Sequence, residues 1–566
     1  MLGVSTCYGA PSHLLFGDTV IASGTGLHQG DPLASLEFAL ALHPVLLEIQ
    51  RRVPDLPLNA WYQDDGTVAG TKEQLARVVD TLHELGPARG LVLSTHDTVP
   101  AGAKAKTTVW SRLQLGEIDP LNKGIPRAEG LGITLLGAPV GYPGHVEVAL
   151  QAQVTKVAEV LSLLHTLKDP HTEFCLLRWC LSLPKVMHLL RSTPTIGHEE
   201  SLEEFDHLIL QALTDLLGAG MPELQTWQAR LPVSMGGLGL QAAADHAAAA
   251  YVSSIVASKD LFRAMLGMEA DQPSPPICPS TLATLATNFG EVESVTESSL
   301  EGLTQRQLSL KVDLANQRLL STHTEVAGER EVARLASVSL PHAGKWLNCP
   351  PMPAMGLHLR GEQFITAVKV RLGMPVYADA RPCPACNRPS DTLADHSLCC
   401  GTGGERARRH DLLRDCLFDM AVEAGLAPVK EGRALIPGTE RRPADLLIPG
   451  WCGGRDAALD VTVIHPLQAA TRAGAATTPG YALTFAYDRK VRGAGELCRR
   501  EGIAFIPVVA ESLGGLHPTA VEQLRRLARG VAMKMGEEEG TALNHLLSRV
   551  SLTLMKGLAS MVLNRS

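Results

Sequence analysis

The sequence predicts an α+β protein made of several domains, and three patterns indicate this class. Alternating apolar and polar residues in short stretches such as Leu58–Gly70 predict β-hairpins in the first quarter of the chain. Residues 146–345 carry apolar side chains at helical spacing instead. After residue 405 the patterns of a helix, two strands, a helix and a third strand follow one another. A chain of 566 residues has room for about three to four domains of ~150 residues.

Composition narrows the class of protein. A hydrophobic content of 45% is enough for a sizeable core. The sequence contains no run of about twenty apolar residues, so we expect no membrane span. The first residues do not have the pattern of a secretory signal. Twelve cysteines in a chain of this length indicate a reducing compartment, with some thiols available for metal. The formal charge of −8 gives no support to nucleic-acid binding, although a basic channel can exist on an acidic protein.

The stretch Leu58–Gly70 places Asp64 and Asp65 side by side between two apolar runs. This pattern predicts a β-hairpin with two carboxylates at its tip. Paired carboxylates suit Mg²⁺, and a two-metal site can assist phosphoryl transfer. A solvated Asp-Asp-Gly turn is the alternative.

Upstream of the hairpin, the loop Gly26–Leu33 leads into a helical pattern over Leu33–Arg52. Asp31 is the expected N-cap and Pro32 the expected first helical residue. Pro44 should kink the helix.

The sequences GLHQGDPL and YQDD, about thirty residues apart, resemble motifs B and C of a reverse transcriptase palm of the non-LTR retrotransposon type. The resemblance implies that Asp64 and Asp65 bind catalytic Mg²⁺ or Mn²⁺. It also implies that Gln29, Gly30 and Asp31 help to position the template and the incoming nucleotide.

In the resembling family a further essential aspartate, in motif A, lies on an earlier palm strand. Asp18 is the one carboxylate upstream of the Gly26 loop, and it lies too close to that loop. We therefore expect an N-terminally truncated palm whose metal cage is incomplete.

Lys72–Leu85 reads as an amphipathic helix, and Gly90–Ser94 after it resembles motif D. Lys104 or Lys106 then takes the place of the motif D lysine, which can act as a general acid toward pyrophosphate. A solvated loop lysine is the alternative. Leu131–Gly141 resembles the strand-turn that grips the primer end.

The middle of the chain shows helices and no readable chemistry. Val146–Leu167 and Glu173–Leu190 carry repeating apolar faces. Arg230–Leu240, with the Ala-rich helix to Ser258, resembles the thumb and connector of the same elements. Proline-rich stretches at Asp271–Ser280 and Asn348–Met355 indicate boundaries.

A cysteine-rich segment follows, with the spacing of zinc ligands. Cys383 and Cys386 share one tight turn, and His396 and Cys400 arrive later to complete a tetrahedron around Zn²⁺. Cys399 competes for the fourth place, and free cysteines on a loop are the alternative. The segment resembles the zinc knuckle of these retroelements, and the His-x3-Cys spacing of that family favours Cys400. A centre with four protein ligands is expected to be structural or to contact nucleic acid.

The last third predicts an α/β unit with carboxylates on neighbouring strands, a pairing that can share Mg²⁺. Its expected elements are helix Arg406–Gly425, strand Arg442–Pro449, strand Asp456–His465, helix Ala482–Arg500, strand Gly502–Glu511 and helix Pro518–Met533.

This order, with RPAD, ALDVTV and GIAFIPVVAE, resembles the PD-(D/E)xK restriction-like endonuclease of site-specific non-LTR retrotransposons. The resemblance implies that Asp445 and Asp460 hold Mg²⁺ and that Lys490 orients or deprotonates the attacking water. Thr462 occupies the usual lysine position, and Ala494 stands where the family has a tyrosine. Separate surface charges are the alternative.

Taken together, the chain resembles the C-terminal part of a non-LTR retrotransposon polyprotein. It would nick target DNA and extend the 3′ hydroxyl with deoxynucleotides on an RNA template, with the polymerase incomplete. A DNA substrate would place it in the nucleus, without membrane contact. A catalytically inactive remnant that binds nucleic acid is the alternative. The expected domains are a partial palm (1–145), a helical thumb and connector (146–345), a linker with the knuckle (346–404), the endonuclease (405–535) and a helical tail (536–566).

Overall fold

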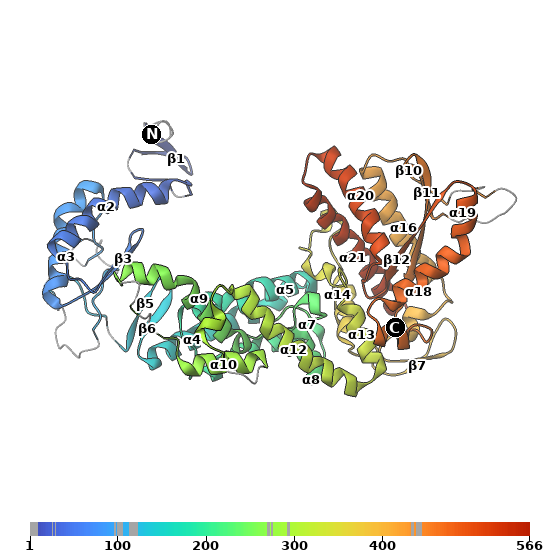
Figure 1. Cartoon of the computed structure of the whole chain (residues 1–566), viewed down its shortest axis with the longest axis horizontal. Coiled ribbons are helices and arrows are strands. Elements are labelled where there is room, and N and C mark those ends of the chain that lie inside the picture. The colour runs from blue at the N-terminus through green and yellow to red at the C-terminus, as the bar shows by residue number, and fades with distance from the viewer. Residues whose placement is uncertain are drawn as a thin grey trace. The chain divides into compact units, whose positions relative to one another are not determined.

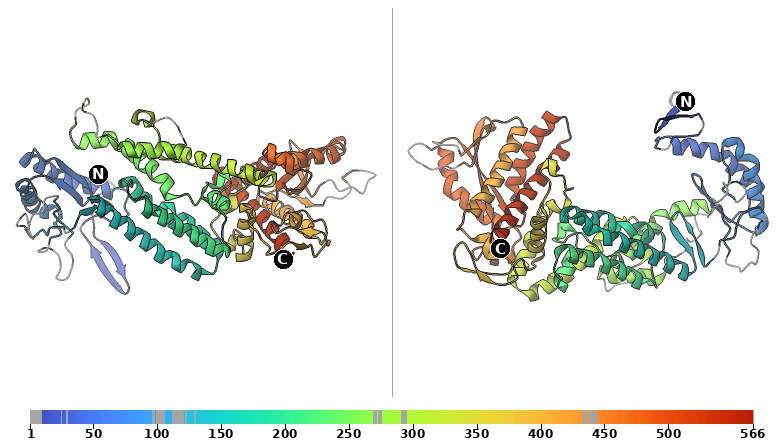
Figure 2. Two further views of the ribbon diagram at one scale, coloured as in Figure 1. Left: turned by 90° about the horizontal axis from the view of Figure 1, so that it is seen from below. Right: turned by 180° about the vertical axis from the view of Figure 1, so that it is seen from behind.

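A computed structural model gives the fold of the chain (Figures 1 and 2). It describes residues 10–24, 26–28, 30–95, 98, 106–111, 121, 123–128, 130–268, 272, 276–290, 295–431, 435–436 and 444–565. The structure is mixed α+β with about 58% helix and small sheets, which confirms the predicted class. It divides into two compact units, Met1–Leu150 with Ser254–Cys278 and Gln151–Ser253 with Pro279–Ser566.

In its described residues the first unit contains hairpins and helices of its own, together with residues 143–150 and 254–265 of two longer helices that continue into the second unit. Antiparallel pairs form the three hairpins β1 (Ser12–Phe16) with β2 (Thr19–Ser23), β3 (Leu58–Tyr62) with β4 (Asp65–Ala69), and β5 (Gly132–Leu135) with β6 (Ala138–Gly141). The helices are α2 (Ala34–Arg52), α3 (Lys72–Leu85) and the short η1 (Pro87–Arg89). The bounds of α3 agree with the prediction, because Thr71 and Gln74 form a capping box at its start.

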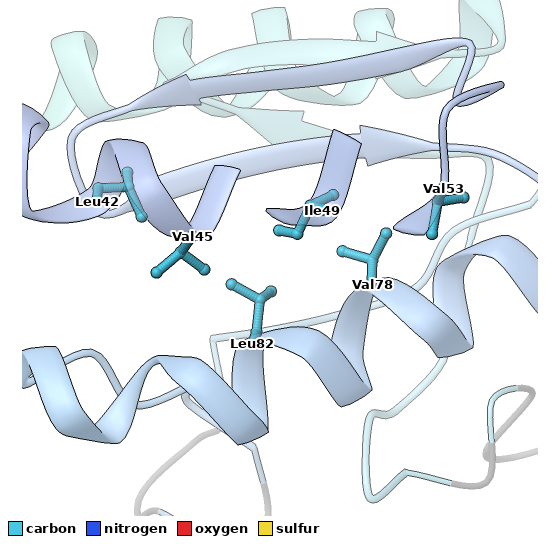
Figure 3. Packing of buried hydrophobic residues seen from close by; sticks show 6 residues of the cluster. All are labelled: Leu42, Val45, Ile49, Val53, Val78 and Leu82. Atoms are coloured by element: carbon cyan, nitrogen blue, oxygen red, sulfur yellow. The ribbon is translucent and has the colours of Figure 1, made fainter. Parts of the chain in front are cut away.

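The core of this unit lies between α2 and α3. Figure 3 shows six side chains pointing toward one another, namely Leu42, Val45, Ile49, Val53, Val78 and Leu82. Their spacing of three or four residues places them on one face of each helix. Leu36, Leu40 and Leu47, which also fit helical spacing, lie exposed on α2.

The start of α2 differs from the prediction. The helix begins at Ala34, with Leu33 as its N-cap residue. Asp31 is therefore not the N-cap. Its Oδ1 accepts the Leu33 N–H at 2.8 Å and so stabilises the turn that precedes the helix. Pro44 lies inside α2, which runs unbroken to Arg52.

Helices make up the middle of the chain, as predicted. They are α4 (Pro143–Leu164), η2 (His165–Leu167), α5 (Pro170–Leu176), η3 (Leu177–Leu181), α6 (Leu183–Ser192), α7 (Glu199–Leu217), α8 (Glu223–Arg230), η4 (Val233–Met235), α9 (Ala243–Met265), α10 (Pro279–Phe289), α11 (Glu297–Leu300), α12 (Gln305–Ala327), α13 (Glu329–Val338), η5 (Lys345–Asn348), η6 (Pro353–Met355) and α14 (Gly361–Leu372).

The predicted single helix Glu173–Leu190 is wrong in one respect. The structure divides it into α5, the π-helical turn η3 and α6, with the break at Ser182. Pro184 at the start of α6 has no N–H to continue the ladder, and the Ser182 N–H bonds to the Leu177 carbonyl at 2.8 Å. The apolar spacing runs on through the break and does not reveal it.

A four-stranded sheet organises the C-terminal part. Its order is β12 (Ala504–Glu511), β11 (Arg455–Ile464), β10 (Leu446–Cys452) and β9 (Val429–Lys430). Strand β11 is antiparallel to β10 and parallel to β12, with Leu459 opposite Leu446 and Asp460 opposite Pro507. The surrounding helices are α16 (Glu405–Glu423), α17 (Arg472–Thr477), α18 (Tyr481–Lys490), η7 (Val491–Gly495), α19 (Glu496–Arg500), α20 (Pro518–Met535) and α21 (Glu539–Leu563). The predicted order of helices and strands is present, with the helix 482–500 interrupted by the π-helical η7.

The stretch expected as a helical tail is a core helix. Helix α21 packs against α14, α16 and α20, and most of its length is buried. Among the described helices it alone is long and apolar enough to cross a membrane, and 72% of that stretch is buried inside the protein. A buried core helix has the same composition, so the absence of a membrane span stays a prediction.

Candidate active site and metal centre

The acidic hairpin of the first unit has its two aspartates at the turn. Tyr62 and Asp65 are the last paired residues of β3 and β4, so Gln63 and Asp64 form the two-residue loop. Gln63 adopts a φ of 55°, and its side chain donates to the Ser35 hydroxyl at 2.8 Å. Both aspartates are exposed, and the contacts described for the hairpin tie it to the start of α2. The two carboxylates thus lie at the tip of the predicted hairpin, and the binding of Mg²⁺ there stays a prediction.

The other residues expected near this hairpin are only partly described. Gln29 and Lys104 lie outside the described residues. Gly30 has a φ of 94°, a conformation that favours glycine. Lys106 is exposed, and its backbone N–H donates to the Ser94 hydroxyl at 3.0 Å. This contact fixes the backbone of Lys106 and leaves its role a prediction.

The cysteine-rich segment brings the four predicted ligands together. The ligand atoms of Cys383, Cys386, His396 and Cys400 all lie within 4.8 Å of one another. The Cys383 and Cys400 sulfurs are 4.0 Å apart, and the Cys386 sulfur is 3.3 Å from His396 Nε2. Such a group can bind a metal ion such as zinc, because three thiolates and an imidazole suit tetrahedral coordination.

Local hydrogen bonds explain why these residues converge. The short strands β7 (Arg381–Pro382) and β8 (Pro389–Ser390) enclose the first cysteine pair, and the helix α15 (Asp395–Cys399) carries the histidine. The Asp391 carboxylate accepts the backbone N–H groups of Asp395 and His396, both at 3.0 Å. Asp391 thereby fixes the start of α15, and with it the direction of the His396 ring.

The structure distinguishes the two adjacent cysteines. Cys400 belongs to the cluster, and Cys399 does not. Burial raises the pKa of Cys399 to about 12, which keeps it a neutral thiol. Burial alone would also raise the pKa of Cys400, but neighbouring groups, among them the Arg565 guanidinium, hold it below its usual value.

The second constellation lies where β10 and β11 begin their pairing. Asp445 directly precedes β10 and Asp460 lies within β11. The Asp445 N–H donates to the Leu459 carbonyl at 3.0 Å, and its Oδ2 accepts the Val461 N–H at 2.6 Å. The backbone of β11 therefore holds the Asp445 carboxylate beside the strand that carries Asp460.

Helix α18 adds the lysine. Lys490 Nζ lies 2.8 Å from Asp460 Oδ2 and 3.1 Å from Oδ1. Thr462 occupies the position where the resembling family has its lysine. Its side chain is partly buried, and its hydroxyl has no hydrogen-bond partner among the described residues. Ala494 lies in η7 and offers no polar group. The three predicted nuclease residues are thus brought into one ionic cluster.

A fourth member of this cluster, His410, was missed as a site residue. It lies on α16, and its Nε2 is 3.0 Å from Asp445 Oδ2, while Nδ1 is 3.2 Å from the Asp411 carboxylate. The hydrogen bond to Asp445 raises the pKa of His410. The sequence shows His410 among arginines at the start of a helix, and only the packing of that helix on the sheet reveals its partner.

The pKa values of the two carboxyl groups shift in opposite directions. Burial would raise the pKa of Asp445, but His410, the Val461 N–H and the Lys490 charge together lower it below its usual value. Burial raises the pKa of Asp460, and the charge of Asp445 adds to the rise despite the ion pair with Lys490. The negative charge of each carboxylate disfavours that of the other, and a bound cation relieves this repulsion.

Comparison with known proteins gives a distant match. The chain is 24% identical over 537 residues to the Retrotransposable element SLACS 132 kDa protein of Trypanosoma brucei gambiense. The match covers 90% of this chain and 37% of that protein, so the chain spans little more than a third of its relative. No protein-family profile matches the chain. The similarity supports a retrotransposon-like origin.

Proposed function

We propose that this chain is a retrotransposon-derived enzyme whose C-terminal part nicks DNA in a metal-dependent reaction. One observation carries the proposal. Two carboxylates from paired strands, Asp445 and Asp460, meet the ammonium of Lys490 in one partly buried cluster. This is the set of groups that phosphodiester hydrolysis needs, and the distant relative is a retrotransposon protein.

The residues present fit a hard divalent cation. Both hydrogen bonds described for the Asp445 carboxylate go to Oδ2, so we assign Oδ1 to the metal. Asp460 would supply the second carboxylate, with the rest of the shell from water and phosphate oxygens. When bound, Mg²⁺ or Mn²⁺ would act as a Lewis acid toward the scissile phosphodiester.

The protein groups orient the reactants. His410 and the Val461 N–H fix the direction of the Asp445 carboxylate. The carboxylate therefore loses no further conformational entropy when the reactants bind. Lys490 is held by Asp460 within 2.8 Å, and its remaining N–H groups can direct the attacking water or stabilise charge on the phosphate.

The hydroxyl left at a nick would serve the first unit as a primer. In this proposal Asp64 and Asp65 bind Mg²⁺ for extension with deoxynucleotides on an RNA template. Gly30, Asp31 and Lys106, with Gln29, would contact the nucleotide and the template. The cluster at Cys383, Cys386, His396 and Cys400 would hold structural Zn²⁺. The DNA substrate would place the chain in the nucleus.

Nicking of supercoiled plasmid tests the central claim. The full chain should nick with Mg²⁺ or Mn²⁺, Asp460→Asn should abolish nicking, and Lys490→Gln should slow it by about 10²-fold or more. Matched controls are Asp488→Asn and Arg489→Gln, exposed charges on the same helix as Lys490 that should nick like the unmodified chain.

Three other results would change the proposal. Binding of DNA without metal-dependent nicking would leave a nucleic-acid-binding remnant. Nicking that survives Asp460→Asn would place the chemistry elsewhere. Robust primer extension by the purified chain would show that the polymerase is complete, against the expectation from its sequence.

A further inference from the structure

The last turn of α21 reaches the cysteine cluster. Arg565 follows this helix and is 2% exposed. Its Nη1 donates to the Ser397 carbonyl at 3.1 Å, and its Nη2 donates to the Thr402 carbonyl at 2.7 Å and to the Glu405 carboxylate at 3.0 Å. Ser397 directly follows the ligand His396, and Thr402 lies two residues after the ligand Cys400. One guanidinium therefore bridges the backbone on both sides of the last ligand.

The Nε–H of this guanidinium is free to donate beside the loop that carries Cys400. Arg565 Nε is buried and has no hydrogen-bond partner among the described residues. Its guanidinium interacts with the Cys400 side chain. A buried N–H without an acceptor is costly, and a metal-bound thiolate is a good acceptor for it.

The end of α21 is itself held in place by the knuckle. The Tyr377 hydroxyl donates to the Val562 carbonyl at 2.9 Å and lies 2.9 Å from the Ser397 hydroxyl. Arg381 Nη2 donates to the Arg565 carbonyl at 2.9 Å. These bonds fix the backbone of Arg565, so the direction of its side chain is preset.

We propose that Arg565 is an outer-sphere positioning residue of the Cys383–Cys386–His396–Cys400 centre. It fixes the loop that carries Cys400 and donates a hydrogen bond from Nε to the Cys400 sulfur when metal is bound. The proposal rests on the zinc assignment made above. Three thiolates and one imidazole around Zn²⁺ carry a net negative charge, and the buried guanidinium lies where it can compensate it.

The test measures metal retention in the full chain. Zinc is titrated away with a chromogenic chelator from the unmodified chain, from Arg565→Met and Arg565→Lys, and from Arg549→Met. Arg549 lies on the same helix and pairs with Glu423, so its variant loses an arginine of α21 away from the cluster. We expect about 10–100-fold weaker zinc binding for Arg565→Met, an intermediate loss for Arg565→Lys, and none for Arg549→Met.

A spectroscopic readout separates this role from simple packing. With Co²⁺ in place of zinc, loss of an N–H···S bond makes the thiolate a stronger donor. The sulfur-to-cobalt charge-transfer band should then move to longer wavelength in both Arg565 variants. An unmoved band with unchanged zinc binding would overturn the proposal, and so would an equal loss in Arg549→Met. Should Arg565→Met fail to fold, the same two measurements on Arg565→Lys decide the matter.

The outcome can be told apart from failure of the nuclease proposal. If the unmodified chain binds no zinc, the metal assignment falls and this inference with it, whatever the nicking assay shows. If it binds zinc and both Arg565 variants behave like it, only the role of Arg565 is refuted.

Discussion

Glu511, the last residue of β12, should make the second unit less stable as the pH rises. Its side chain is fully buried, and neither carboxylate oxygen has a hydrogen-bond partner in the part of the chain that the structure describes. Burial raises the pKa of Glu511 from 4.5 to about 8, and the nearby Ser337 hydroxyl offsets only part of this rise.

The direction and size of the change in the free energy of unfolding follow from the pKa of Glu511 in the unfolded and in the folded state. Between 4.5 and about 8 the native state keeps a proton that the unfolded state has lost, so the free energy of unfolding falls with rising pH. The stabilisation that comes from keeping the Glu511 carboxyl protonated is fully present below pH 4.5. It is lost as the pH rises through about 8. At about 1.4 kcal/mol per pH unit the whole interval is worth on the order of 5 kcal/mol. Relaxation around a buried charge and entry of water reduce this, and we expect about 2–3 kcal/mol.

Glu511→Gln removes the titration and keeps the shape of the side chain. Urea unfolding of the full chain, followed by tryptophan fluorescence, should show equal stability near pH 5 and a more stable variant near pH 8. Trp346 is a suitable probe because it is buried in the same unit. Glu501→Gln, an exposed glutamate in the turn before β12, is the matched control and should show no pH-dependent difference. A difference between Glu511→Gln and the unmodified chain that is the same at both pH values would refute the reasoning.

Three further predictions concern the core, the acidic hairpin and the metal cluster. Ile49→Ala empties a fully buried position and should lower the free energy of unfolding of the first unit by about 2–5 kcal/mol, whereas Leu47→Ala, at a 52% exposed position, should change little; chemical unfolding measures both. Gly66→Ala would place a methyl carbon 2.5 Å from the neighbouring indole ring, so we expect a loss of about 1–2 kcal/mol and a changed near-ultraviolet circular dichroism spectrum. Cys400→Ser should lose zinc in metal analysis after dialysis, whereas Cys399→Ser, outside the cluster, should keep it, and the reverse result would show that the ligand is misassigned.

The sequence was sufficient where one local signal decides the structure. Thr71 and Gln74 mark the start of α3 through a capping box, and the bounds of that helix were predicted to the residue. The spacing of the four cysteine and histidine residues predicted their cluster, because ligand spacing on a tight turn is itself local.

The sequence was insufficient where contacts between distant elements decide. His410 meets Asp445 across 35 residues, and no pattern in α16 indicates that partner. Arg565 meets Ser397 across 168 residues, and the sequence pattern shows it only as part of the predicted helical tail. Strand β9, with two residues, is too short to show an alternation. The break at Ser182 follows from Pro184, whose effect the continuing apolar spacing conceals.

The packing of α21 also has a consequence for synthesis on the ribosome. This helix follows along the chain every element that it packs against, and Arg565 is made 168 residues after Ser397. A ribosome that adds about 5–20 residues per second needs roughly 10–30 s for that interval. During this time α14 and α16 lack the helix that covers them in the folded protein, and the cysteine cluster lacks the guanidinium of Arg565. The apolar residues of α14 that α21 buries are thus a target for chaperones until α21 has been made.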